Sequence, residues 1–159
     1  MFRSFLASCV LCALVAALPV VAVASPIELS AVTVHLFLDG TGEFTSDVTD
    51  MKGFGARNFR PFADGQDFGA NNFHSLLVKI LFTAPVETLE NGRVAELTVS
   101  NVDTGKIILR RTISGVYVGA NGRTTIPILL SGHECDALQI VVKSSTTTIR
   151  KHLAFRCAE

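Results

Sequence analysis

The histidines of this sequence are candidate metal ligands, because neutral imidazole is a common ligand of zinc and copper. The chain has four histidines, and no two of them stand at a spacing typical of metal ligands. They are His35, His74, His133 and His152. A metal site would therefore have to be assembled from distant strands, with acidic loop residues beside it. Such a site predicts a metal-assisted hydrolase or a metal-binding protein, which is the alternative functional hypothesis.

Acidic residues that could bind calcium lie in two turn-rich segments, one at 39–50 and one around Gly65. The candidate ligands are Asp39, Glu43, Asp64 and Asp67. Calcium needs several oxygen ligands that a tight loop brings together, and the EF-hand places them at alternate positions. The spacing here departs from that pattern. We therefore interpret both segments as solvated turns, and we predict no cofactor.

The tripeptide Asp103-Thr104-Gly105 matches the one that carries the catalytic aspartate of aspartic proteases, in which two carboxylates share a proton. In those enzymes it follows an apolar strand, whereas Ser100 and Asn101 precede it here, and the chain has no second copy. A type I turn between two strands accounts for the same residues. The sequence contains no G-x-S-x-G motif, which would indicate a serine nucleophile. The sequence therefore favours a non-catalytic protein.

The N-terminal segment has the order of a secretory signal peptide. Arg3 precedes an apolar run over 5–18, and Pro19 and an Ala-Val-Ala sequence follow it. We expect cleavage after residue 24, so that 1–24 is removed and 25–159 forms a single domain. An uncleaved membrane anchor is the alternative, and Pro19 and the small-residue site argue against it. The expected location is therefore secreted or periplasmic, without membrane attachment after cleavage.

Four cysteines are present, and Cys9 and Cys12 belong to the segment expected to be removed. The remaining pair, Cys135 and Cys157, is expected to form a disulfide in an oxidising compartment. Neither lies in a C-x-x-C motif, which argues against redox or metal chemistry. A bridge closing such a loop would stabilise the fold by about 3 kcal/mol.

Charge limits the partners that the sequence supports, because Lys plus Arg and Asp plus Glu each total 14. No run of basic residues is present, so we expect no binding to nucleic acid or to anionic lipid. The chain has no Trp and one Tyr, whereas sugar-binding modules usually stack sugar rings on these side chains. We predict a small exported binding or interaction module whose partner is an unidentified protein or envelope component.

Apolar and polar residues alternate along most of the chain after residue 30, which is the pattern of strands with one buried face. Val78 and Ile80 are expected in the core, and Ser75 and Thr98 on the solvent side. The predicted strands are 31–40, 74–83, 93–100, 106–113, the two arms of 115–130, 137–143 and 147–157. Asn121-Gly122 predicts a hairpin between those two arms. The pattern predicts an all-β fold, an antiparallel β-sandwich of about seven or eight strands, immunoglobulin-like in the broad sense.

The last two predicted strands carry information on their own register. A hairpin centred on Thr146 would place Cys135 opposite Cys157. The apolar positions from Leu138 to Val142 are even-numbered, however, whereas Ile149 and Leu153 are odd-numbered. Pairing the two apolar faces therefore requires an offset of one residue. A loop or a bulge before the first strand can absorb this offset.

A doubled hexapeptide, FGARNF at 54–59 and FGANNF at 68–73, lies in a Phe/Gly-rich loop over 50–73. Gly, Asn and Asp in this loop disfavour a long regular strand. We favour an interpretation in which the phenylalanine rings plug one end of the sandwich. The alternative is an exposed partner surface. Its residues would be Phe54, Arg57, Phe59, Arg60, Phe68 and Phe73.

Protein isolated from its native compartment is expected to have an intact mass that corresponds to a chain beginning at or near Ser25. Alkylation should leave Cys135 and Cys157 unmodified before reduction and should modify both after reduction, because a disulfide protects both thiols. Two reactive thiols in the unreduced protein would contradict the disulfide.

Overall fold

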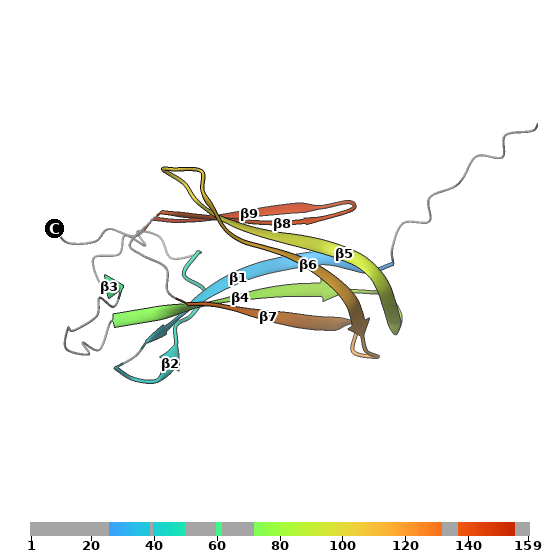
Figure 1. The fold of residues 1–159 in the computed structure, drawn as a ribbon. Coiled ribbons are helices and arrows are strands. Elements are labelled where there is room, and N and C mark those ends of the chain that lie inside the picture. The colour runs from blue at the N-terminus through green and yellow to red at the C-terminus, as the bar shows by residue number, and fades with distance from the viewer. Residues whose placement is uncertain (1–25, 39, 50–59, 62–71, 132–136, 155–159) are drawn as a thin grey trace, which may run out of the picture.

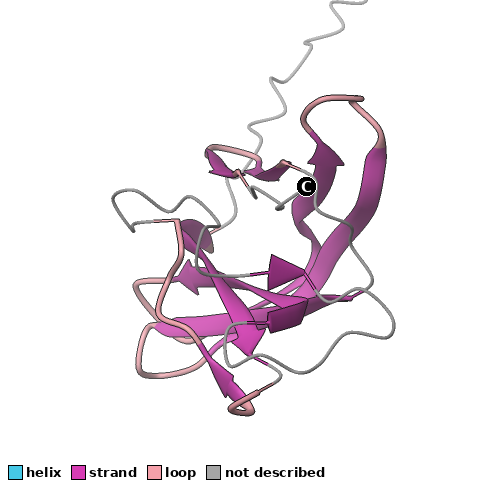
Figure 2. Cartoon of the chain, turned by 90° about the vertical axis from the view of Figure 1, so that its left-hand side faces the viewer, coloured by secondary structure: helices cyan, strands magenta, loops and turns pink. Residues whose placement is uncertain are grey.

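The computed structural model describes residues 26–38, 40–49, 60–61, 72–131 and 137–154, and these contain strands, turns and loops but no helix (Figure 2). The strands are β1 (Glu28–Leu38), β2 (Glu43–Phe44), β3 (Arg60–Pro61), β4 (Asn72–Thr83), β5 (Thr88–Asn101), β6 (Ile107–Val118), β7 (Arg123–Ser131), β8 (Leu138–Ser144) and β9 (Thr148–Leu153). The all-β prediction is confirmed for this part of the chain.

The strands form two sheets that lie one above the other (Figure 1). Sheet A has the order β2-β1-β4-β3, and β7 also pairs with β4. Sheet B has the order β6-β5-β8-β9. All pairings are antiparallel except the short one between β3 and β4. The result is a two-layer, sandwich-like arrangement.

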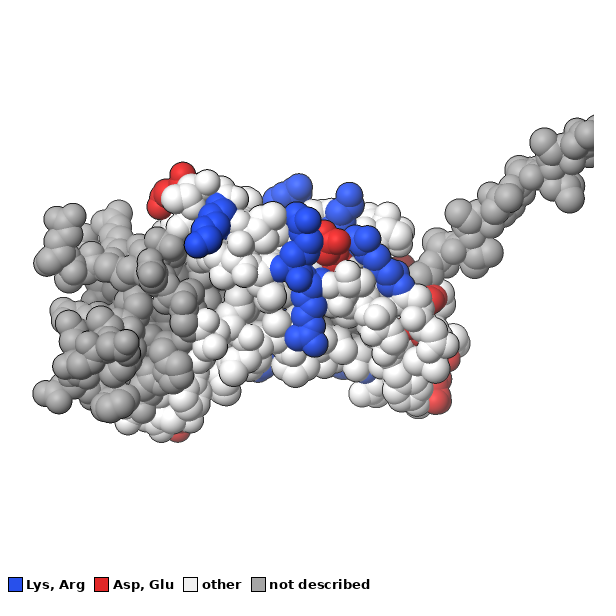
Figure 3. Space-filling model, in the orientation of Figure 1, with Lys and Arg blue, Asp and Glu red and all other residues white. Residues whose placement is uncertain are grey.

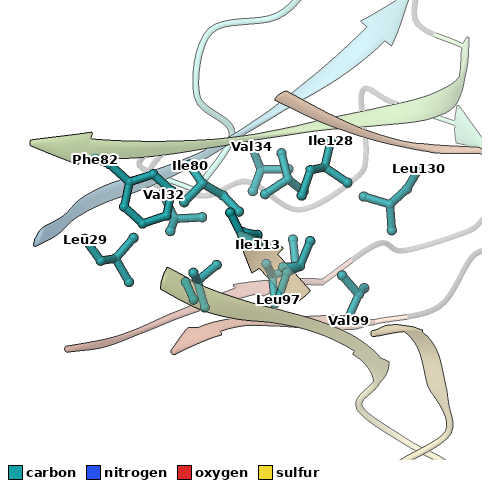
Figure 4. Close-up of a cluster of buried hydrophobic side chains, with 14 of the residues drawn as sticks. Leu29, Val32, Val34, Ile80, Phe82, Leu97, Val99, Ile113, Ile128 and Leu130 are labelled. Atoms are coloured by element: carbon teal, nitrogen blue, oxygen red, sulfur yellow. The ribbon is translucent and has the colours of Figure 1, made fainter. Parts of the chain in front are cut away.

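The core lies between the sheets and follows the alternation in the sequence. Val32, Val34 and Leu36 of β1 are buried, and so are Val78 and Ile80 of β4. Figure 4 shows side chains of sheet A, such as Val34 and Ile80, directed toward side chains of sheet B, such as Leu97. Because a strand exposes alternate residues to opposite faces, each sheet contributes one apolar face to a shared core.

The β8–β9 hairpin confirms the predicted offset of one residue. Leu138 pairs with Leu153, and Val142 pairs with Ile149. Ser144 closes the turn between these strands, because its hydroxyl accepts hydrogen bonds from the backbone N–H groups of Thr146 (3.4 Å) and Thr147 (3.0 Å). Matching of apolar faces therefore determines this register.

The prediction of a hairpin at Asn121-Gly122 is wrong. β6 pairs with β5 in sheet B and β7 pairs with β4 in sheet A, so the turn carries the chain from one sheet to the other. Gly122 has φ +71° and donates to the Gly119 carbonyl at 2.9 Å, so the local turn itself is real. Local residues determine that the chain reverses here, whereas burial of each arm determines which strand it pairs with.

Several predictions fall on residues outside the described part of the chain. These include the signal peptide, Cys135 and Cys157, and most of the Phe/Gly-rich loop. Within that loop, the described β3 pairs in parallel with the first two residues of β4. Among the described residues, no helix is long and apolar enough to cross a membrane.

Ser75 differs from the expectation drawn from alternation. It lies on the outer side of β4, where it pairs with Phe37 of β1 and Ser131 of β7. Its exposed fraction is only 4%, so the expectation that it faces solvent is wrong. Alternation identifies the outer side of a strand but does not report what covers that side. Lysine at Ser75 is therefore unsuitable as a neutral substitution.

Val78→Lys is expected to unfold the domain, because Val78 is 0% exposed. A buried, unpaired charge costs several kcal/mol against a total stability of about 5–15 kcal/mol. Thr98→Lys is the matched control, since Thr98 lies half-buried on the outer face of β5 and a longer side chain can extend into solvent there. Thermal melts of both variants make the comparison, and equal loss of stability in the two would contradict the assigned strand faces.

Candidate functional site

The histidines do not form a metal centre within the described residues. His35 Nδ1 donates to the Thr45 carbonyl at 2.8 Å, and its Nε2 lies 3.0 Å from the Thr33 hydroxyl. Both ring nitrogens therefore already have partners. His152 is exposed on β9, while His133 and the side chain of His74 are not described. No three His, Cys, Asp or Glu side chains of the described residues are grouped to hold a metal.

Of the calcium candidates, only Glu43 lies in the described residues, and it is exposed on β2. Asp39, Asp64 and Asp67 are not described. A group of polar contacts surrounds Asp47, which lies in the acidic segment 39–50 but was not among the candidate ligands. This carboxylate follows β2 and lies against the outer edge of β1.

Asp47 and Thr45 take the place of a neighbouring strand along β1. Asp47 Oδ1 accepts from the backbone N–H of Val34 (2.9 Å), and Thr45 Oγ1 accepts from that of Leu36 (3.0 Å). Thr45 in turn donates its own N–H to the Leu36 carbonyl at 2.9 Å. The side chains therefore satisfy edge groups that would otherwise be unpaired. This is a structural arrangement, because every contact serves the backbone of β1 or its own turn.

The charge of Asp47 is also stabilised. Burial by itself raises the pKa of this carboxyl, but hydrogen bonds from Val34 and Thr49 and the positive charge of Lys151 hold it below its usual value. Its second oxygen, Oδ2, is buried without a hydrogen-bond partner among the described residues. Because Lys151 belongs to β9, the attraction links the edges of the two sheets.

The Asp103-Thr104-Gly105 segment forms the turn that was predicted. Asn101 Oδ1 accepts from the Thr104 N–H at 2.8 Å, and Gly105 has φ +69° while donating to the Asn101 carbonyl at 3.0 Å. Asp103 is exposed. The segment thus joins β5 to β6, and its geometry is that of a turn closed by a side-chain cap.

The outer face of sheet B gathers cationic side chains from all four of its strands. We call this surface the basic face; it comprises Arg93 (β5), Arg110 (β6), Lys143 (β8) and Arg150 (β9). Glu96 is the acidic residue between them, and Arg93 Nη2 donates to its Oε2 at 2.7 Å. Figure 3 shows Lys and Arg side chains gathered around a small acidic area near the middle of the molecule.

Strand pairing explains why the sequence did not reveal this face. Thr98 pairs with Arg110 on one side and with Val141 on the other, and Val141 pairs with Arg150. The two arginines therefore lie in one row across the sheet, at three strand spacings or roughly 14 Å. They are far apart in the chain, and across the sheet Thr98 and Val141 lie between them. Only the strand order brings them to a common surface.

A pocket of about 200 Å³ opens at one end of the basic face. Its lining residues are Arg93, Val94, Ala95, Lys143, Ser144 and Ser145. Arg93 pairs with Ser114 and Ala95 pairs with Ile113, so Val94 is an extra residue in β5. Such a β-bulge bends a strand and redirects its side chains. This bulge was not predicted, because the alternation of apolar and polar residues does not show where an extra residue shifts the side chains from one face of the strand to the other.

The residues proposed for a Phe-rich partner surface are not brought together by the described structure. Phe54, Arg57, Phe59 and Phe68 lie outside it. Arg60 is in β3 and Phe73 is in β4, where their backbones are described but their side chains are not. The packing of the doubled hexapeptide therefore stays a prediction.

Comparison with known proteins found no protein-family model that matches the chain and no curated protein that matches it significantly.

Asp47→Ala is expected to destabilise the fold by about 1–3 kcal/mol, because the Val34 N–H loses its acceptor. Asp47→Asn is the matched variant, since it keeps an oxygen at this position and removes only the charge. The folded-state pKa is lowered, so the charge contributes stability above the unfolded pKa of about 3.9, and this contribution is lost as the pH falls through the folded value.

Urea unfolding at neutral pH and at pH below 4 measures both effects. Wild type should lose more stability on acidification than Asp47→Asn does, because only the wild type carries the titrating carboxyl at this position. Equal stability of the alanine variant and the wild type would show that the edge of β1 does not depend on Asp47.

Proposed function

We propose that this chain is a small exported, non-catalytic binding protein that recognises an anionic envelope polymer through the basic face. Export rests on the order of charge, apolar run and small residues in 1–24. The proposed architecture is a β-sandwich that is immunoglobulin-like in the broad sense, and the two packed sheets support it. The observation that carries the functional proposal is the basic face, to which each of the four strands of sheet B contributes one cation.

The composition of the basic face fits a polymer with repeated acidic groups. Its four cations are accompanied by a single carboxylate, Glu96, and charged groups across an interface act mainly by steering and by fixing orientation. Hydroxyl side chains lie beside the cations, namely Thr98, Thr112 and Thr148. These can donate to ring or carboxylate oxygens of a polysaccharide.

The shape of the surface supports an extended partner as well. Small-molecule sites are usually concave and enclose most of the ligand. The row from Arg150 to Arg110 instead runs across the outer surface of a sheet and spans all four of its strands. A linear polyanion can contact both ends of such a row, and separate contacts along one chain raise its overall affinity.

The Arg110→Gln, Arg150→Gln double variant is expected to bind immobilised dextran sulfate more weakly than wild type does, at every salt concentration. The slope of log affinity against log salt should fall in magnitude by about one per cation removed, because fewer counterions are released. Retention at a series of NaCl concentrations provides the measurement.

Arg123→Gln is the matched control, because Arg123 is an exposed arginine at the start of β7 in sheet A, away from the basic face. It should behave as wild type does. A wild type that is not retained, or a control that loses as much affinity as the double variant, would refute the proposal.

A further inference from the structure

We infer that the pocket at the β5 bulge binds a single carboxylate carried on a short apolar group. This makes it the specific subsite of the basic face. The inference rests on the proposed function, because Arg93 and Lys143 belong to that face. It adds a defined ligand chemistry, namely an organic acid or an acidic substituent of the polymer whose carboxylate stands on an apolar body.

The pocket exists because two strands part at this point. β5 and β8 pair from Asn101 with Leu138 as far as Ala95 with Ser144, where β8 ends. β5 continues past Ala95 to its start at Thr88, paired on its other side with β6. The bulge at Val94 falls at this junction. One side of β5 therefore becomes open directly beside the last residues of β8.

The floor and the rim of the pocket differ in character. Val94 and Ala95 are 6% and 1% exposed, so they contribute an apolar floor that is already packed against the core. Arg93 and Lys143 form a cationic rim. An apolar cavity of about 150 Å³ is large enough for a benzene-sized molecule, and this pocket has a volume of about 200 Å³. A short apolar group therefore fits on the floor, with its charge at the rim.

The cations at the rim are able to bind a ligand carboxylate. Arg93 uses one nitrogen for Glu96, and a guanidinium carries five N–H donors, so further donors remain. Its side chain is 61% exposed and can turn toward the pocket. Lys143 makes no ion pair with any described residue. A ligand carboxylate at the rim would therefore have Arg93 on one side and Lys143 on the other.

Apolar and charged parts of the ligand can be tested separately with three probes. Hexanoate carries both parts, acetate carries the charge alone, and hexan-1-ol carries the apolar chain alone. In amide ¹H–¹⁵N spectra of the folded protein, hexanoate is expected to shift the signals of Val94, Ala95, Ser144 and Ser145. At equal concentration, acetate and hexan-1-ol should cause much smaller shifts at these residues.

Two variants test the assigned roles. Lys143→Gln should weaken hexanoate binding by about tenfold, because it removes a charge-assisted contact. Ser145→Trp should also block binding, since a bulky side chain at the lining occupies the space without removing a cation. Arg123→Gln should bind hexanoate as wild type does. Unchanged melting temperatures would show that neither pocket variant acts by unfolding the protein.

The outcomes separate this inference from the proposed function. Retention on dextran sulfate without hexanoate shifts at the pocket would overturn the pocket inference and leave the basic face intact. Hexanoate bound at the pocket without retention on dextran sulfate would support the pocket as an organic-acid site and refute the polymer. Equal shifts from hexanoate and hexan-1-ol would overturn the assignment of Arg93 and Lys143 as ligand contacts.

Discussion

Burial of one face of each sheet against the other is the constraint on which this structure depends. The core side chains of β1, β4, β5 and β8 come from alternate positions, and each is removed from water only when the opposing sheet is present. The outer faces of the sheets do not need to be apolar. Sheet B can therefore place Arg110 and Arg150 on its outer face while Leu97 and Val99 fill the core from the same region.

Two edges of sheet A are protected by different means. Asp47 and Thr45 bond to the outer edge of β1, and the attraction between Asp47 and Lys151 of β9 adds a link to the other sheet. β7 pairs with β4 on one side, and Pro127 in β7 has no backbone N–H group to donate. Such features discourage pairing with other chains along an edge. The proposed binding surface lies on the outer face of sheet B and does not require these edges to pair with another chain.

Alternation in the sequence predicted most of each long strand, most of the buried faces and the offset in the β8–β9 hairpin, because each of these depends on local spacing. It divided β6 into two strands and did not predict the short strands β2 and β3. It did not predict that Asn121-Gly122 connects the two sheets, since pairing partners depend on burial of distant segments. The basic face was missed for a related reason: its members come from four strands, and only strand order makes them neighbours. The bulge at Val94 has no residue signature in this sequence, and the pocket depends on it.

The pairing of β7 with β4 has a consequence for the order in which the chain can be completed. β5 meets β6, and β8 meets β9, across short turns, so these hairpins need little loop closure. β4 ends at Thr83, whereas β7 begins at Arg123, and the whole β5–β6 hairpin lies between them. During synthesis, in which the N-terminus emerges first, one edge of β4 therefore stays unpaired until β7 has been made. Sheet A depends on contacts of large sequence separation, and such contacts set the pace of folding in β-proteins.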